Sequence, residues 1–220
     1  MGKPGPKRTL SEDAIVAAAL EVLDERGADA VSVRSIAARV GIAPNAVYTY
    51  FPDKAAVLRA VVDRLIGEQS LAVLAGDEPW QDRIRTVALG LRSSLLRHPG
   101  AATLLMSAPM DGPRALEFGE RLLDVLSEAG FTPEDAARLS YALIVYILGA
   151  IALEAAEVDP SRPAPPEEER IALRRNGFAK VPADTFPRTA AAAEVMARYV
   201  STEQFLWGLD RVLGRATIPS

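Results

Sequence analysis

The segment spanning residues 32–54 constrains the fold of this chain more than any other stretch. Ser32 can cap a short helix that Gly41 ends. Pro44 suits the first turn of a third helix, because its missing N–H would have no partner there, and Pro52 must break that helix about two turns later. Two short helices around a glycine, with a longer helix directly after them, predict a helix-turn-helix.

The third helix, from Pro44 to about Phe51, is expected to bury little more than Val47. Its outward side is therefore available for binding. Asn can contact adenine through two hydrogen bonds, Thr offers a methyl and a hydroxyl group, and Tyr hydroxyls can reach phosphates. The residues expected on this side and its flanks are Asn45, Tyr48, Thr49 and Tyr50. The alternative is that the tyrosines and Arg34 only seal a small three-helix core.

Charge is distributed unevenly along the chain, whose net charge is -4. The first 64 residues hold nine Lys and Arg against eight Asp and Glu, whereas the remainder holds 16 against 21. Only the first quarter is therefore suited to face phosphate. Lys3, Lys7 and Arg8 lie among Gly and Pro at the N-terminus. They form either a disordered terminus or a basic arm that lies along phosphates or in a minor groove.

The whole chain is expected to be all-α, since no stretch alternates with period two over a useful length. Ser11 and Gly27 delimit a first helix, and a long fourth helix is expected from Asp53 to about Ala75. Six or seven more helices follow. The expected domains are a helix-turn-helix domain with its basic arm (residues 1–56) and a larger helical domain (residues 57–220). The helix at 188–200 is expected to be continuous.

The most apolar run, Tyr141–Leu153, is expected to be a buried helix that is too short to cross a bilayer. It is apolar nearly all round, so one face requires cover from another layer, and a second copy of the chain is the expected partner. The N-terminus lacks the apolar run of a signal peptide and the chain has no Cys. We therefore expect a cytoplasmic protein without a membrane partner.

No catalytic constellation, cofactor motif or metal-ligand cluster is evident, so an enzyme is not expected. The sole histidine, His98, is interpreted as a structural residue at a helix C-terminus. Glu154 and Glu157 are interpreted as the end of a buried helix that reaches water. The three acids at 167–169 are interpreted as a solvated first turn.

Residues 11–65 resemble the N-terminal DNA-binding domain of TetR-family transcriptional regulators. The positions that match the family pattern are Ser32, Arg34, Ile36, Ala37, Gly41, Ile42, Tyr48, Tyr50, Phe51 and Lys54. The resemblance implies three groups of DNA contacts. Arg34 and Lys54 would hold the backbone or an adjacent base. Base edges would be faced by Asn45, Ala46 and Thr49, and phosphates would be contacted by Tyr48 and Tyr50.

The C-terminal part resembles, more loosely, the regulatory domain of the tetracycline repressor subgroup, through its Pro79-Trp80-Gln81-Asp82 segment and its closing residues 205–209. This resemblance implies a homodimer whose helices at 133–158 and 201–213 form a four-helix bundle, with a ligand cavity in each subunit. Leu105 stands where the tetracycline repressor has a histidine that coordinates the magnesium of its drug. The implied lining residues are Ser70, Val87, Leu91, Leu105, Met106, Leu122 and Ile144, with Glu154 near the rim. The alternative is a closed core.

Together these features predict a ligand-responsive regulator of transcription, in the form of a homodimeric repressor. A small apolar or drug-like effector would release it from a palindromic operator. No cofactor is expected. The alternative function is a helical small-molecule-binding protein that does not bind an operator specifically.

Overall fold

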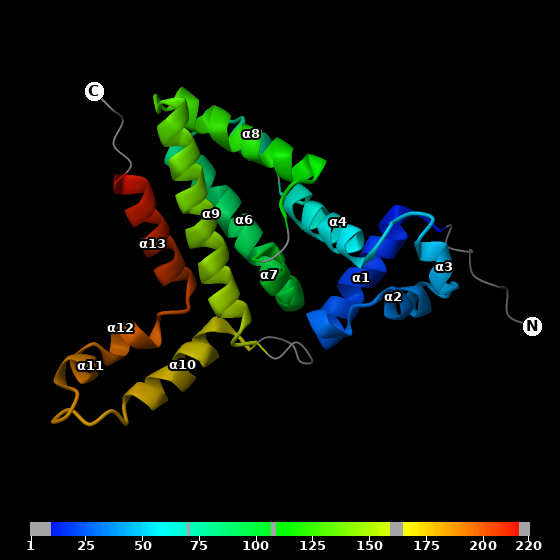
Figure 1. Cartoon of the computed structure of the whole chain (residues 1–220). Helices are drawn as coiled ribbons and strands as arrows, with labels where there is room; N and C mark the ends of the chain where they lie inside the picture. The colour runs from blue at the N-terminus through cyan, green and yellow to red at the C-terminus, as the bar shows by residue number, and fades with distance from the viewer. Residues whose placement is uncertain (1–9, 70, 107–108, 159–164, 216–220) are drawn as a thin grey trace, which may run out of the picture.

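The computed structural model describes residues 10–69, 71–106, 109–158 and 165–215, and the regular structure in these ranges is helical (Figure 1). This confirms the all-α prediction. The N-terminal elements, which we call the head, are α1 (Glu12–Arg26), η1 (Ala28–Ala30), α2 (Val33–Val40) and α3 (Pro44–Val47). They are followed by α4 (Lys54–Gly67), α5 (Leu71–Leu74), α6 (Trp80–Arg97), α7 (Pro99–Leu105), α8 (Pro113–Glu128) and α9 (Pro133–Ala155). The last elements are α10 (Glu167–Phe178), α11 (Pro187–Ala191), α12 (Ala193–Ala197) and α13 (Thr202–Arg215).

Short-range caps set the ends of the helices in the head. The Ser32 hydroxyl accepts a hydrogen bond from the Ser35 backbone N–H at 3.1 Å, and the Ser35 hydroxyl in turn accepts one from the Ser32 N–H at 2.9 Å. This is a capping box. Gly41 ends α2 in the left-handed conformation (φ 80°, ψ 36°), which glycine adopts without steric cost. The predicted start of α3 at Pro44 is confirmed, but the α-helix ends at Val47 and not near Phe51, and hydrogen-bonded turns follow it.

Helix α4 is shorter than expected, because it ends at Gly67 and does not continue to Ala75. Gly67 carries no side chain, and Arg114 of α8 packs into the space that a Cβ would fill. The chain therefore turns away at Gly67, and α5 is a separate helix. The turn buries the side chain of Gln69.

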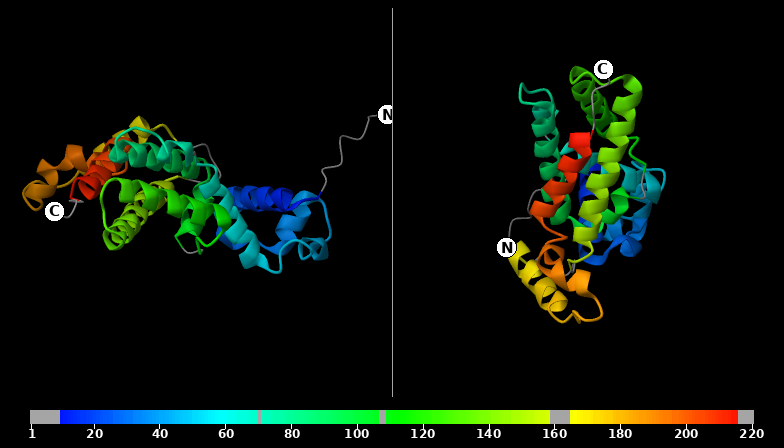
Figure 2. Two further views of the ribbon diagram at one scale, coloured as in Figure 1. Left: turned by 90° about the horizontal axis from the view of Figure 1, so that it is seen from above. Right: turned by 90° about the vertical axis from the view of Figure 1, so that its left-hand side faces the viewer.

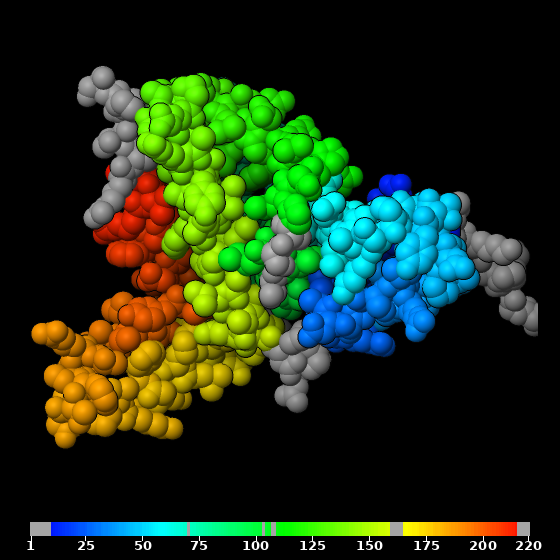
Figure 3. Space-filling view, in the orientation of Figure 1, coloured from blue at the N-terminus to red at the C-terminus, as the bar shows by residue number. Residues whose placement is uncertain are grey.

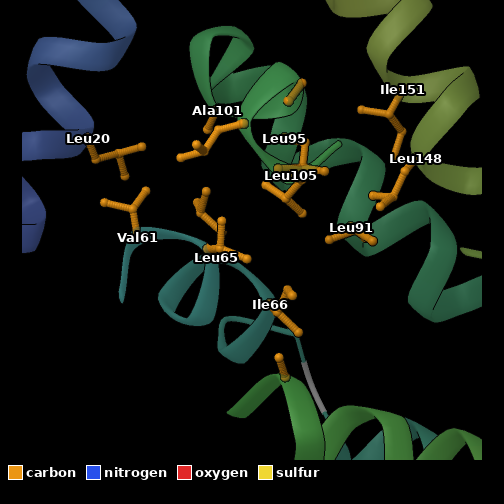
Figure 4. Packing of buried hydrophobic residues seen from close by; sticks show 14 of the residues in the cluster. Leu20, Val61, Leu65, Ile66, Leu91, Leu95, Ala101, Leu105, Leu148 and Ile151 are labelled. Atoms are coloured by element: carbon orange, nitrogen blue, oxygen red, sulfur yellow. The ribbon is translucent and has the colours of Figure 1, made fainter. Parts of the chain in front are cut away.

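The head is attached to the rest of the molecule at one end of an elongated structure (Figure 2). Helix α4 packs against α1 on one side and against α7 and α8 on the other. Figure 4 shows Val61 of α4 pointing towards Leu20 of α1, while Leu65 points towards Ala101 and Leu105 of α7. Because one apolar core runs through α4, the predicted domain boundary at residue 56 lies inside a shared helix and stays a prediction.

Helix α9 is the centre of the larger part, where it contacts α6, α7, α8 and α13. It has 23 residues, and its most apolar window reaches a mean hydropathy of 1.9. By length and composition alone the helix could therefore cross a membrane, which corrects the expectation drawn from the apolar run. One side of α9 remains uncovered in the single chain, with Tyr141 exposed to 70% and Leu153 to 69%.

Helices α10 to α12 project together from the larger part (Figure 1), and we call them the arm, as distinct from the predicted basic segment at the N-terminus. The continuous helix expected at 188–200 is two short helices with a break at Ala192. This Ala-rich segment has few large side chains to bury, and it is held instead by Arg174 of α10. The guanidinium of Arg174 donates hydrogen bonds to the carbonyl oxygens of Ala197 and Val200, both at 2.8 Å.

Candidate nucleic-acid interface and effector cavity

The segment after Gly41 is anchored by one side and open on the other. Val47 is completely buried, whereas Asn45 and Thr49 are exposed and Tyr48 is exposed to 53%. Among the described residues, nothing hydrogen-bonds to the side chains of these three exposed residues. Figure 3 shows the segment at the end of the molecule remote from the larger part, and it is uncovered on the face in view. The geometry leaves this side free to enter a groove of DNA.

The two tyrosines differ in their surroundings. Tyr50 is half-buried, and its hydroxyl donates a hydrogen bond to the carbonyl oxygen of Leu10 at 3.1 Å. This bond ties the start of the described chain to the head. Tyr48 makes no such contact. The alternative role as a seal of the head therefore applies to Tyr50 and not to Tyr48, and phosphate contact by either residue stays a prediction.

Two basic side chains, one on α2 and one at the start of α4, are available for an anionic partner. Arg34 is exposed, Lys54 is partly exposed, and neither forms an ion pair with a described residue. Arg39 is different, because it binds the carboxylates of Glu21 and Glu25 on α1. The hydrogen bonds from Arg39 to Glu25 and then to Glu21 raise the pKa of the guanidinium. Arg39 therefore links α2 to α1. The basic segment predicted at the N-terminus, with Lys3, Lys7 and Arg8, lies outside the described residues.

Polar contacts join the head and α4 to the larger part. His98, at the junction of α6 and α7, lies with its Nδ1 2.6 Å from Oδ2 of Asp24 on α1. The histidine therefore contacts a residue 74 positions away on α1, and its structural role stays an interpretation. Gly100 lies so close to the carbonyl group of Leu23 that a Cβ would overlap it. Helix α7 is thus seated directly on α1.

Asp63 of α4 supplies the cap for α8. Helix α8 begins after Gly112, which provides no side-chain cap. Oδ1 of Asp63 accepts hydrogen bonds from the backbone N–H groups of Arg114 at 2.9 Å and Ala115 at 3.0 Å. These two donors would otherwise lack partners at the helix N-terminus. The cap couples α4, which supports the head, to α8, which forms one wall of a cavity.

A cavity of about 370 Å³ lies in the larger part, a volume within the range of small-molecule sites. It is enclosed by residues from the end of α4, from α5 to α9 and from the connection before α8. Five residues expected to line a ligand cavity are brought together here. They are Val87, Leu91, Leu105, Leu122 and Ile144.

Three other residues expected at the cavity do not line it in the described structure. Ser70 lies outside the described residues. Met106 follows α7, is exposed to 55% and is not part of the wall. Glu154 is not at the rim, because it is buried among arginines. Gln69 was not anticipated, because the turn that buries it follows from the packing of α8 against Gly67. The 3.6-residue pattern of α8 could have indicated Phe118 and Leu123, which also line the cavity.

Glu154 belongs to a buried ion network and does not reach water as expected. Arg92 of α6 contacts both of its oxygens, at 2.7 and 2.8 Å, and Arg170 of α10 contacts Oε1 at 2.6 Å. At 3% exposure the Glu154 carboxylate has little access to water, and the two guanidinium groups supply the hydrogen bonds that water would otherwise provide. The network joins α6, α9 and the arm, and no part of it lines the cavity.

Glu167 extends this network, so the first turn of α10 is not simply solvated. Its carboxylate accepts hydrogen bonds from the backbone and hydroxyl of Thr202 and from Arg92, at 3.0, 2.7 and 3.0 Å. Partial burial raises the pKa of Glu167, but the bonds from Thr202 and Arg92 outweigh it and leave the pKa below its ordinary value of 4.5. The ionised carboxylate therefore holds the start of α13 against the arm.

Metal chemistry has no site in the part of the chain that the structure describes, where no group of three or more His, Asp or Glu could hold an ion. Leu105, which the resemblance places where the tetracycline repressor has its magnesium-binding histidine, is buried in the cavity wall. Its side chain offers apolar contact and no metal ligand.

Comparisons with known proteins agree with this architecture. Residues 15–61 match the model of the bacterial regulatory proteins of the tetR family, and residues 74–214 match that of the tetracyclin repressor-like C-terminal domain. An HTH-type transcriptional regulator of Saccharopolyspora erythraea is 35% identical over 148 residues, which are 67% of this chain and 62% of that protein. The class D tetracycline repressor of Escherichia coli is 30% identical over 173 residues, which are 77% of this chain and 78% of the repressor.

A solved transcriptional regulator of the TetR type from Streptomyces coelicolor superimposes with a TM-score of 0.75 and 31% identity, covering 94% of this chain and 98% of the other. The chain spans less than two thirds of the length of the Saccharopolyspora relative. The two family models together extend over both the head and the larger part. Their members are transcriptional regulators and not enzymes. The chain belongs to the tetR family of bacterial regulatory proteins.

Proposed function

We propose that this protein is a ligand-responsive transcriptional regulator that acts as a homodimeric repressor. In this proposal, it binds palindromic operator DNA through the head and leaves the DNA when a small apolar or drug-like molecule fills the cavity. The observation that carries the proposal is the uncovered side of the segment at 44–50, in a chain that also encloses a cavity. A short helix with one buried residue has no structural need for such a side.

The proposed DNA contacts follow from position and chemistry. Asn45 and Thr49 are exposed and suited to base edges, with Ala46 beside them in partial exposure. Tyr48 and Tyr50 are assigned to phosphates, and Tyr50 would then exchange or share its bond to the Leu10 carbonyl. The cations proposed to hold the DNA backbone are Arg34, Lys54 and the N-terminal residues Lys3, Lys7 and Arg8.

A homodimer is supported by the uncovered apolar side of α9 and α13. Tyr141, Val145 and Leu153 on α9 and Trp207 on α13 are all at least half exposed in the single chain. A second copy placed against these helices would form a four-helix bundle and cover them. The two heads must then lie about 34 Å apart to enter successive major grooves. This arrangement also gives α9 an apolar partner without a membrane.

Release from DNA follows from the thermodynamic linkage between effector binding and DNA binding. An effector that binds more tightly to a dimer whose heads have another spacing withdraws that dimer from DNA, to the extent of the difference in affinity. The Asp63 cap on α8 is one route by which a change at the cavity wall would reach α4. Regulators of this kind act on DNA in the cytoplasm, and we assign this protein to the same compartment.

The proposal is tested by selecting bound duplexes from a random pool with the full chain and measuring affinity for the enriched sequence by gel shift. We expect a palindromic sequence to be enriched. Asn45→Ala should relax the base preference of the enriched sequence, whereas Asn176→Ala should not, because Asn176 is an exposed residue of α10, remote from the head. If no sequence is enriched while the cavity still binds small molecules, the alternative of a binding protein without an operator replaces this proposal.

A further inference from the structure

We propose that the effector is an uncharged, predominantly apolar molecule with a single hydrogen-bonding group, and that the Gln69 carboxamide recognises this group. The inference rests on the proposed function only in treating the occupant of the cavity as an effector. It defines the chemical class of the occupant and the residue that selects it.

The wall of the cavity is apolar almost throughout. Its described polar side chains are Gln69, Glu120 and Ser140. Glu120 is exposed, so it lies at the edge of the cavity and not in its interior. Ser140 is partly exposed, and its hydroxyl already donates a hydrogen bond to the carbonyl oxygen of Ala137 at 2.9 Å. Gln69 is therefore the one described polar side chain that is both buried and part of the wall.

The carboxamide of Gln69 has no hydrogen-bond partner among the described residues. The residue is 9% exposed, and its backbone N–H donates to the Ile66 carbonyl oxygen at 3.1 Å. Its side-chain amide makes no hydrogen bond to any described residue. The polar atoms of this largely buried side chain therefore remain available, and a ligand that reaches them from the cavity would gain hydrogen bonds in a mostly apolar surrounding. An amide offers both an N–H donor and a carbonyl acceptor, so a ketone, amide or hydroxyl group on the ligand would fit.

Helix α6 leaves room for this carboxamide. A Cβ on Gly90 would lie only 2.9 Å from Oε1 of Gln69, and outside its own stretch of α6 it would meet no other described atom within 4 Å. Gly90→Ala would therefore displace the flexible end of Gln69 without disturbing backbone. This substitution provides a second way to move the amide while its chemistry is kept.

The charges of the cavity wall exclude anionic ligands. No Lys, Arg or His is among the described residues that line the cavity, and its one ionisable residue is the acidic Glu120. A carboxylate or phosphate would lose its hydration on entry without gaining a cation in return. A neutral ligand loses much less, and its apolar surface gains from contact with Val87, Leu91 and the other aliphatic side chains.

The test uses three probes of similar size: 2-acetylnaphthalene, which carries a ketone, 2-isopropenylnaphthalene, which replaces its oxygen by carbon, and 2-naphthoate, which is charged. Binding to the full chain is measured by equilibrium dialysis at pH 7. We expect the ketone to bind about fivefold more tightly than the alkene, as one neutral hydrogen bond allows. The carboxylate should bind more weakly than either neutral probe.

In Gln69→Leu, which keeps an apolar side chain of similar size, the ketone and alkene should bind equally and the alkene should lose no affinity. Gly90→Ala should also reduce the preference for the ketone, with circular dichroism unchanged. Equal binding of ketone and alkene by the wild type, an unchanged preference in Gln69→Leu, preferential binding of the carboxylate or no binding of any probe would overturn the inference. A gel shift with the ketone is a separate readout. Gln69-dependent binding without release of DNA would refute the effector role and leave the ligand class intact.

Discussion

The Asp63 cap on α8 leads to the most direct prediction, because the helix has no cap of its own. Replacing Asp63 by Ala leaves the N–H groups of Arg114 and Ala115 without their acceptor and removes a negative charge from the helix N-terminus. Losing a cap of this kind typically lowers the free energy of unfolding by about 1–2 kcal/mol. The lost charge adds up to about 1 kcal/mol, so we expect about 2 kcal/mol in total.

The assay is urea unfolding followed by circular dichroism, with the protein concentration held constant because a dimer unfolds in a concentration-dependent way. A loss of about 2 kcal/mol should lower the midpoint by about 0.7–1 M at an unchanged slope. Asp63→Asn keeps an acceptor oxygen and loses only the charge, so it should lose less than half as much. Asp111→Ala is the matched control, since Asp111 is exposed and bonds to no described residue.

A second perturbation reaches the same bond from the other side. Gly112 lies against the Asp63 carboxylate so closely that a Cβ would overlap it, although the φ of Gly112, −72°, suits any residue. Gly112→Ala should therefore displace the carboxylate and reduce stability by a similar amount. A stability of Asp63→Ala within about 0.5 kcal/mol of Asp111→Ala, the usual scatter for surface changes, would refute the reasoning.

Three further outcomes are expected. Asn45→Ala should relax base preference in a binding selection, whereas Lys54→Ala should weaken binding to all duplexes alike and reduce the salt slope by about 1; equal operator affinities for wild type and both variants would contradict the assignment. Tyr141→Glu should convert the dimer to a monomer in sedimentation, because it places a charge on the uncovered side of α9, and an unchanged dimer would exclude this side as the interface. Glu167 has a lowered pKa, so its stabilisation is complete above about pH 4.5 and is lost as pH falls through that lower value. Wild type should consequently lose more stability than Glu167→Gln between about pH 5 and pH 3, and parallel losses would show that the carboxylate is not responsible.

The head could be predicted almost completely from the sequence, because its signals are local. Ser32 caps α2 from within its own first turn, Gly41 ends the same helix, and Pro44 opens the next one. Each of these residues acts on atoms no more than about five residues away.

The errors concern contacts between distant parts of the chain. The end of α4 at Gly67 depends on Arg114, and the burial of Glu154 depends on Arg92, which is 62 residues away. Nothing in the sequence near Glu154 distinguishes a buried carboxylate from one that reaches water. Five residues of the cavity wall were predicted from the family resemblance. Gln69 was not predicted, because its place in the wall depends on the turn after α4.

The seat of α7 on α1 limits how the head can move. The His98–Asp24 pair and the close approach of Gly100 to the Leu23 carbonyl fasten the head at a place separate from α4. A body fastened at two places cannot swing freely about either one. Any sliding of α7 along its axis must carry α1 with it or break the pair. The attachments at α4 and at α7 therefore jointly set the orientation of the exposed segment at 44–50.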